Sequence, residues 1–280
     1  MSPTRPKIAT FVVDAFASEP FRGNPAGVCV LERKLDDALM QKIAMEMNHA
    51  ETAFVVRLEL KPVSDCSRFS LRWFTPQVEV DLCGHATLAT AATIFKEYAS
   101  TASRLSFETK SGTLTVERKG ESEFEMDFPT QAVFETTAPA GLIDALGVGA
   151  VEALHVAERS FYVVRVPESV DLTKLKPDFS KLIAVTLNHQ AHGVIVTRKG
   201  PNPFDFSSRM FAPWIGINED PVTGAAHTVL TPYWRTLLKK EKMMAYQASA
   251  RGGEVGVNLS GNRVLLTGRA VVVLRGELLV

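Results

Sequence analysis

Hydrophobic residues in this chain fall mostly into short β-branched or alternating runs, and few segments show the spacing of an amphipathic helix. Strands are predicted where Val, Ile, Phe and Thr cluster, at 8–16, 27–31, 52–60 and 68–74. Helices are predicted over 36–47, where apolar residues recur every three or four positions, and over the alanine-rich segment 86–98. Residues 105–116 indicate a hairpin. The pattern predicts an α+β protein in which strands dominate.

Three short motifs recur in the same order, at an offset close to half of the 280 residues. The paired segments are Arg72-Trp-Phe-Thr-Pro76 with Arg209-Met-Phe-Ala-Pro213, Gly84-His-Ala-Thr-Leu-Ala89 with Gly224-Ala-Ala-His-Thr-Val229, and Ser111-Gly-Thr-Leu-Thr-Val116 with Gly252-Gly-Glu-Val-Gly-Val257. A repeat of this length indicates two domains and not a solenoid. Segment 128–139 contains two prolines and several threonines, and we interpret it as the linker.

A duplicated lobe favours a ligand site between the two copies, because interfaces between domains are common places for such sites. Gly84 and Gly224 each stand where a helix is expected to begin. Free backbone N–H groups and the helix dipole make a helix N-terminus an anion site, so a carboxylate is the expected ligand. Pro232 falls inside the second of these helices, which is therefore expected to bend or restart there.

Charge and cysteine content exclude several partners. The 31 basic and 31 acidic side chains cancel, so no field of one sign attracts nucleic acid or an anionic membrane. The three cysteines are widely spaced, as expected for reduced thiols. No signal core and no apolar run of about 18 residues is present, so a cytoplasmic location is expected. A small-molecule partner remains by elimination.

Glu51 is the leading candidate for acid/base chemistry. It stands between a predicted helix and an apolar strand, where partial burial would raise the pKa of its carboxyl toward a useful range. The alternative is a turn glutamate that caps a neighbouring element. The matching position of the second half falls near His192, which indicates that this carboxylate is not part of the shared scaffold.

Other polar residues near the two predicted helix starts allow both functional and structural interpretations. His85 is expected to be neutral because the helix dipole opposes a positive charge, but it could equally pack on a lobe surface. Asp220 precedes a proline and is also typical of a turn or N-cap. His227 is expected to be structural. No phosphate loop, nucleophile elbow or metal-ligand spacing occurs, so no cofactor and no metal are expected.

Cys83 provides an alternative base or nucleophile, because a thiol before a helix N-terminus has a lowered pKa. A two-base racemase would need a second thiol in the other half. Val222 and Thr223 stand there instead, and no cysteine follows Cys83. A mechanism with one base is therefore favoured.

Five motifs together resemble the phenazine-biosynthesis PhzF-like family over essentially the whole chain. They are Phe21-Arg-Gly-Asn-Pro-Ala-Gly-Val28, His49-Ala-Glu-Thr-Ala-Phe54, Leu71-Arg-Trp-Phe-Thr-Pro76, Val80-Asp-Leu-Cys-Gly-His-Ala-Thr87 and Glu219-Asp-Pro-Val-Thr-Gly-Ala-Ala-His227. The resemblance implies a diaminopimelate-epimerase-like fold, with two similar lobes that are each an open β-barrel around a central helix and an active site in the cleft between them. The expected domains are 1–129, joined by a returning strand at 268–280, and 130–267.

The resemblance also implies a function and roles for named residues. It implies an isomerase without metal or organic cofactor, similar to trans-2,3-dihydro-3-hydroxyanthranilate isomerase, that acts on a small carboxylate and forms a homodimer. Glu51 matches the general acid/base. Four residues match substrate-contacting positions, namely Gly84, His85, Asp220 and Gly224. Ala225 replaces a serine of the phenazine enzyme, which indicates a changed binding pocket. The alternatives left open are a cysteine-dependent epimerase or racemase using Cys83, and a non-catalytic binding protein.

Overall fold

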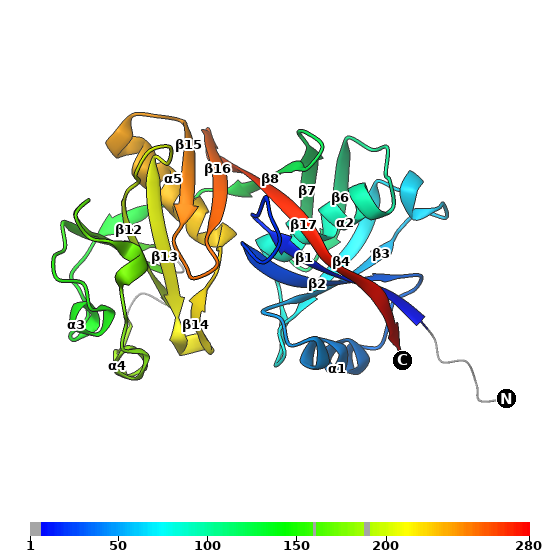
Figure 1. Ribbon diagram of the computed structural model, residues 1–280, viewed down its shortest axis with the longest axis horizontal. Helices are drawn as coiled ribbons and strands as arrows, with labels where there is room; N and C mark the ends of the chain where they lie inside the picture. The colour runs from blue at the N-terminus through cyan, green and yellow to red at the C-terminus, as the bar shows by residue number, and fades with distance from the viewer. Residues whose placement is uncertain (1–6, 159–160, 188–190) are drawn as a thin grey trace. The chain divides into compact units, whose positions relative to one another are not determined.

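The computed structural model describes residues 7–158, 161–187 and 191–280 (Figure 1). The chain divides into a first unit, Met1–Asp127 with Thr267–Val280, and a second unit, Phe128–Leu266. The boundaries expected from the sequence lie one or two residues further along the chain. Of the described helices, none combines the length and the apolar composition that spanning a lipid bilayer requires.

The first unit is a β-barrel with two α-helices. Its elements are β1 (Lys7–Ala15), β2 (Asn24–Leu31), α1 (Asp37–Met47), β3 (Thr52–Arg57), β4 (Arg68–Phe74), β5 (Glu79–Val80), α2 (Gly84–Glu97), β6 (Arg104–Thr109), β7 (Gly112–Arg118), β8 (Glu123–Pro129) and β17 (Arg263–Leu279), with a short 3-10 turn at Val63–Asp65. The predicted strand at 52–60 ends earlier, at Arg57, and the other predicted elements of this half agree within a few residues.

The strand pairings of the first unit close a ring of eight strands. The order is β1–β2–β3–β4–β6–β7–β8–β17 and back to β1, with β5 added beside β4. The expectation of an open barrel is therefore wrong for this unit. The cause is β17, which pairs with β8 and also with β1, from Lys7 opposite Leu279 to Ala15 opposite Ala270 (Figure 1).

Helix α2 is buried on all sides, as a helix in the centre of a barrel must be. Every residue from His85 to Phe95 is buried, and the helix contacts β1, β2 and β3. Small alanines allow the strands to approach closely. The hydroxyl groups of Thr87, Thr90 and Thr93 each donate to the carbonyl four residues earlier, so these three buried hydroxyl groups have partners within the helix.

The second unit repeats much of this order. Its elements are β9 (Val133–Glu135), α3 (Leu142–Leu146), β10 (Ala153–Ala157), β11 (Phe161–Arg165), α4 (Phe179–Ala184), β12 (Gly193–Lys199), β13 (Phe206–Ala212), β14 (Ile217–Asp220), α5 (Gly224–Leu238), β15 (Lys242–Gln247) and β16 (Gly253–Ser260), with 3-10 turns at Leu172–Lys174 and Pro213–Ile215. The pairings run β9–β10–β11–β12–β13–β15–β16, with β14 beside β13. Part of the predicted linker is thus strand β9, which pairs with β10.

Helix α5 passes through Pro232 without restarting. Pro232 has no backbone N–H. The carbonyl of Thr228 therefore lacks the donor that it would have in a regular helix. The backbone N–H of Gln131 donates to this carbonyl at 3.5 Å. The expected restart therefore does not occur, and one continuous helix spans Gly224–Leu238.

Candidate active site

The carboxylate of Glu51 is held at the junction between α1 and β3. Helix α1 ends at Asn48, whose backbone is left-handed with φ of 50°, and the chain then turns into β3. The carbonyl of Glu51 accepts a hydrogen bond from the Gly27 N–H at 3.2 Å, which fixes the residue beside β2. Only 13% of its side chain is exposed. The carboxylate is thus largely removed from water, as the sequence predicted.

Helix α2 begins at Gly84, as predicted, and brings Cys83 and His85 to the same place. Cys83 is the N-cap, with extended backbone and no side-chain capping bond. The first N–H groups of such a helix have no partner within the helix and carry its positive dipole end. His85, in the first turn, has a side chain that is only 6% exposed. This end of α2 therefore combines backbone donors with a thiol and an imidazole.

Glu51, His85 and Cys83 form a row with the imidazole in the middle. Glu51 Oε2 lies 3.3 Å from His85 Nε2, and Cys83 Sγ lies 3.5 Å from His85 Nδ1. The distance between Oε2 and Nε2 is short enough for a hydrogen bond, but the two groups are poorly aligned for one. Among the described residues Nε2 has no hydrogen-bond partner. In enzymes without substrate such contacts are often misaligned and tighten on binding. Nε2 is therefore available to a substrate atom beside the carboxylate.

The imidazole of His85 is neutral near neutral pH. Burial, and to a smaller degree the neighbouring His49, lowers the pKa of His85 to about 3. The sequence predicted a neutral imidazole from the helix dipole, whereas burial is the larger cause.

The arrangement of these three side chains does not suit one shared metal ion. The ligand atoms lie within 4.8 Å of one another, which is compatible with a shared ion. A metal would take one imidazole nitrogen together with the thiolate and the carboxylate on the same side. Here the ring presents Nε2 to the carboxylate and Nδ1 to the sulfur, at opposite edges.

The second unit holds the other residues singled out from the sequence. Asp220 ends β14 and is 9% exposed, and the Thr223 hydroxyl donates to its Oδ2. Gln247 Nε2 donates to the Asp220 carbonyl at 2.7 Å, and Gln247 Oε1 accepts from the Thr223 N–H at 2.9 Å. Asp220 is thus fixed by a network that includes a fully buried glutamine. Nothing in the sequence distinguishes Gln247 from a surface glutamine.

Helix α5 starts at Gly224, as predicted, with Thr223 as N-cap. Gly224 is buried and Ala225 is exposed. His227 is fully buried, and its Nδ1 lies 2.8 Å from the Thr223 carbonyl, to which it donates. Burial lowers the pKa of His227 to about 4. These contacts agree with a structural role for His227.

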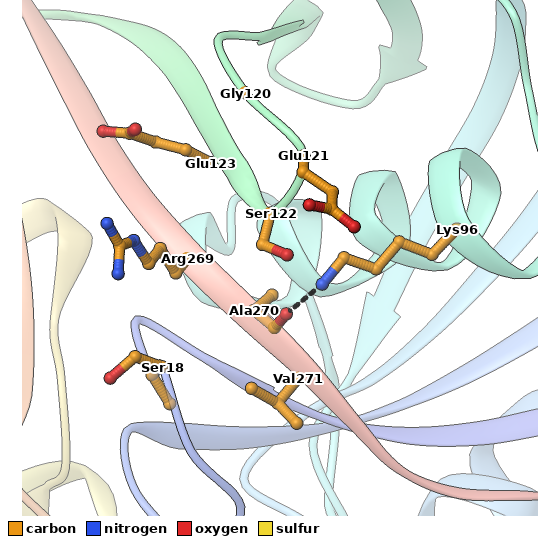
Figure 2. A pocket seen from close by; sticks show the side chains of 10 residues that line it. Ser18, Lys96, Gly120, Glu121, Ser122, Glu123, Arg269, Ala270 and Val271 are labelled. Carbon is orange, nitrogen blue, oxygen red and sulfur yellow. Dashed lines mark hydrogen bonds between the residues drawn. The ribbon is translucent and has the colours of Figure 1, made fainter.

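A separate cavity of about 340 Å³ lies at the other end of α2 (Figure 2). Lys96 lines it and donates to the Ala270 carbonyl at 2.7 Å, and burial lowers the pKa of this lysine. Lys96 follows His85 by eleven positions in α2, roughly 16 Å along the helix axis. The cavity is therefore not part of the Glu51 site.

Comparison with known proteins identifies relatives over nearly the whole length. The family described as phenazine biosynthesis-like protein, PhzC-PhzF, matches residues 13–276. An uncharacterized isomerase of Halalkalibacterium halodurans is 47% identical over 96% of this chain and 97% of its own. A crystal structure of a PhzF-family protein from Enterococcus faecalis has a TM-score of 0.90 at 40% identity, covering 98% of this chain and 100% of that one. A hydroxyproline epimerase from Agrobacterium vitis, 9% identical with a TM-score of 0.59 over 99% and 94% of the chains, is similar in fold only.

Proposed function

Since the chain belongs to the phenazine biosynthesis-like PhzC-PhzF family and is an isomerase, we propose that it moves a proton between two carbons of a small carboxylate, with Glu51 as general acid and base. The observation that carries the proposal is the Glu51 carboxylate, only 13% exposed, beside the neutral His85 imidazole and 3.3 Å from its Nε2. A carboxylate with little water around it is a stronger base than one in solution.

The proposed proton transfer requires only Glu51, His85 and the backbone N–H groups at the start of α2. Glu51 accepts a proton from one carbon, which leaves negative charge on the substrate, and the same carboxyl returns a proton to another carbon. The backbone N–H groups at the start of α2, beginning with Gly84, stabilise the developing charge together with His85. No metal or organic cofactor takes part in this scheme.

Substrate recognition is assigned to both helix starts. In the first unit we assign substrate contacts to Gly84 and His85. For the second unit, the resemblance implies that Asp220 orients polar groups of the substrate and that the backbone of Gly224 binds its carboxylate, and these two roles stay predictions. Ala225 offers no hydroxyl group, and a hydrogen bond to a charged group contributes roughly 1.5–3 kcal/mol. We therefore expect a carboxylate different from trans-2,3-dihydro-3-hydroxyanthranilate, the substrate of the enzyme that the chain resembles. A homodimer stays a prediction, which sedimentation analysis can test.

A second candidate is a cysteine-dependent epimerase or racemase that uses Cys83. It is supported by the position of Cys83 at the N-cap of α2 and by its contact with His85. Against it, all three cysteines belong to the first unit, and the N-cap of α5 is Thr223. A threonine hydroxyl is too weak an acid to replace a second thiol.

The test is proton exchange in heavy water with a panel of small unsaturated and cyclic carboxylates that includes dihydro-hydroxyanthranilate. Turnover and deuterium in the product are followed by NMR for the wild type, Glu51→Gln and Glu46→Gln. Glu46 is an exposed residue of α1, so its substitution removes the same charge without touching the site. We expect turnover of at least one carboxylate, loss of about 100-fold or more in Glu51→Gln and no change in Glu46→Gln.

One result would contradict the proposal. If a substrate is turned over equally by the wild type and by Glu51→Gln, the general base is another group. Inactivation of this Glu51→Gln activity by a thiol reagent would then support the epimerase alternative, in which Cys83 is the base.

A further inference from the structure

Cys83 is the group beside His85 that the proposed reaction leaves without a role. The residue is 7% exposed, and its sulfur faces the Nδ1 edge of the imidazole at 3.5 Å. The opposite nitrogen, Nε2, faces Glu51 and has no hydrogen bond among the described residues. His85 itself is 5% exposed. The nitrogen that carries the proton therefore decides what this buried ring can offer to the carboxylate and to a substrate.

A neutral imidazole has one N–H and one lone pair, and the two tautomers have opposite effects here. With the proton on Nε2, His85 is a donor toward Glu51 or toward a substrate oxygen. With the proton on Nδ1, a lone pair on Nε2 would face a carboxylate, which is an unfavourable pair of acceptors. The charge of Glu51 thus favours the proton on Nε2.

The remaining lone pair on Nδ1 then needs a donor, because a buried acceptor without a partner is destabilising. The thiol of Cys83 can supply it, since an S–H group is a weak donor and 3.5 Å is a normal length for a hydrogen bond to sulfur. His49 is the other titratable group that acts on His85, and it opposes a positive charge on the ring. Together these groups leave the singly protonated ring as the stable form.

We propose that Cys83 is a positioning residue whose S–H donates to His85 Nδ1 and so keeps the proton on Nε2, where it serves the carboxylate site. The inference rests on the proposed function for its catalytic meaning, but the tautomer itself can be measured without a substrate. In this arrangement the thiol remains protonated throughout, so Cys83 acts through His85 and takes no proton from the substrate.

The test is long-range ¹H–¹⁵N NMR of the full chain labelled at its six histidines, which distinguishes protonated from unprotonated ring nitrogens. The His85 signals are assigned by their loss in His85→Gln. We expect the wild type and Cys83→Ser to show the Nε2–H tautomer between pH 6 and 8, because serine retains a donor. In Cys83→Ala the ratio of the Nε2–H to the Nδ1–H form is expected to fall roughly two- to tenfold, as expected for one lost neutral hydrogen bond.

His227 provides the matched control in the same spectrum. Its Nδ1 donates to a backbone carbonyl, so it must show the opposite tautomer and remain unchanged in the Cys83 variants. A wild-type spectrum with the His85 proton on Nδ1 would overturn the proposal, because the ring would then donate to the sulfur. An unchanged ratio in a folded Cys83→Ala variant would overturn it as well. If the tautomers behave as expected while Glu51→Gln remains active, the proposed function fails and the role of Cys83 as a hydrogen-bond donor stands.

Discussion

The two units each contain an equivalent arginine that contacts a glutamate and a phenylalanine, but they differ in the residues beside their central helices. Arg72 on β4 forms a bidentate ion pair with Glu79, and Arg209 on β13 forms an equivalent bidentate pair with Glu219. Each guanidinium also lies over the phenylalanine two positions later, at 5.2 Å in the first unit and 4.9 Å in the second. The repeated motif thus marks a repeated structural unit.

The difference appears where the helices begin. Thr52 pairs with Phe74, and Val194 pairs with the matching Phe211, so the equivalent of Glu51 is Gly193, one residue beyond the position expected from the sequence. A side chain at Gly193 would lie 3.0 Å from the Phe211 carbonyl. Counting from the helix starts, Ala225 stands in place of His85. The scaffold is shared, and the groups for which we propose acid/base chemistry belong to one copy.

The largest expected loss of stability comes from substituting Arg209, and it exceeds the loss expected for Arg72. Arg209 is 8% exposed and also donates to the carbonyls of Leu172 and Leu175, both at 2.8 Å. We expect Arg209→Met to lower the free energy of unfolding by about 3–5 kcal/mol, because it leaves Glu219 largely buried and unpaired. Arg72→Met is expected to cost about 1–3 kcal/mol, since Lys110 remains bound to Glu79.

Urea unfolding measures both variants, with Arg68→Met as the control. Arg68 lies on the same strand as Arg72 and pairs with Glu108 at the surface, so its loss is expected to cost no more than about 1 kcal/mol. Equal effects of Arg72→Met and Arg209→Met would show that the greater burial of the second pair has no energetic weight.

An exchange of residues between the two helices gives the next effect. Eight positions after each helix start stand Ala92 and Pro232. Ala92→Pro is expected to destabilise by about 3 kcal/mol or more, because the proline removes a hydrogen bond inside a buried helix. Pro232→Ala is expected to change stability by less than about 1 kcal/mol, because the Thr228 carbonyl already accepts from Gln131. Thermal and urea unfolding test both, and a large effect of Pro232→Ala would mean that the contact with Gln131 does not replace the missing bond.

A smaller effect, which both units share, is the loss of stability at acidic pH through a buried histidine. The pKa of His85 is lowered to about 3 and that of His227 to about 4, both mainly by burial, from 6.5 in the unfolded chain. At pH values between the folded and unfolded pKa of each histidine, the unfolded chain binds more protons than the folded protein. The contribution of these histidines to stability is therefore highest above pH 6.5 and falls as the pH decreases. Each histidine contributes up to about 1.4 kcal/mol per pH unit. His85→Gln and His227→Gln should each flatten the loss of stability between pH 6.5 and 5, and curves parallel to the wild type would contradict the assignment.

Much of the fold could be predicted from local sequence, and the failures involve contacts between distant segments. The arginine motifs and the helix starts at Gly84 and Gly224 are local signals, and they gave correct elements. The return of the last strand to the first unit was expected from the family resemblance, but its pairing with both β1 and β8, which closes the barrel, could not be predicted from local sequence. Strand β9 was missed because three residues between threonines and prolines carry too short a pattern.

The candidate site was partly visible for similar reasons. Glu51, His85 and Cys83 were each singled out, and the structure brings all three together. The order of the row, with Nδ1 toward sulfur and Nε2 toward the carboxylate, depends on a side-chain rotation that no sequence pattern encodes. Gln247 was missed because its role depends on where β15 ends relative to Asp220.

Strand β17 also determines which contacts the first unit needs in order to fold. Its segment Thr267–Val280 belongs to the first unit, although the whole of the second unit, Phe128–Leu266, separates it along the chain from the rest of that unit. Without this segment, β1 and β8 present unpaired edges. The barrel that holds Glu51 is therefore completed by contacts of long sequence separation, and such contacts are slow to form.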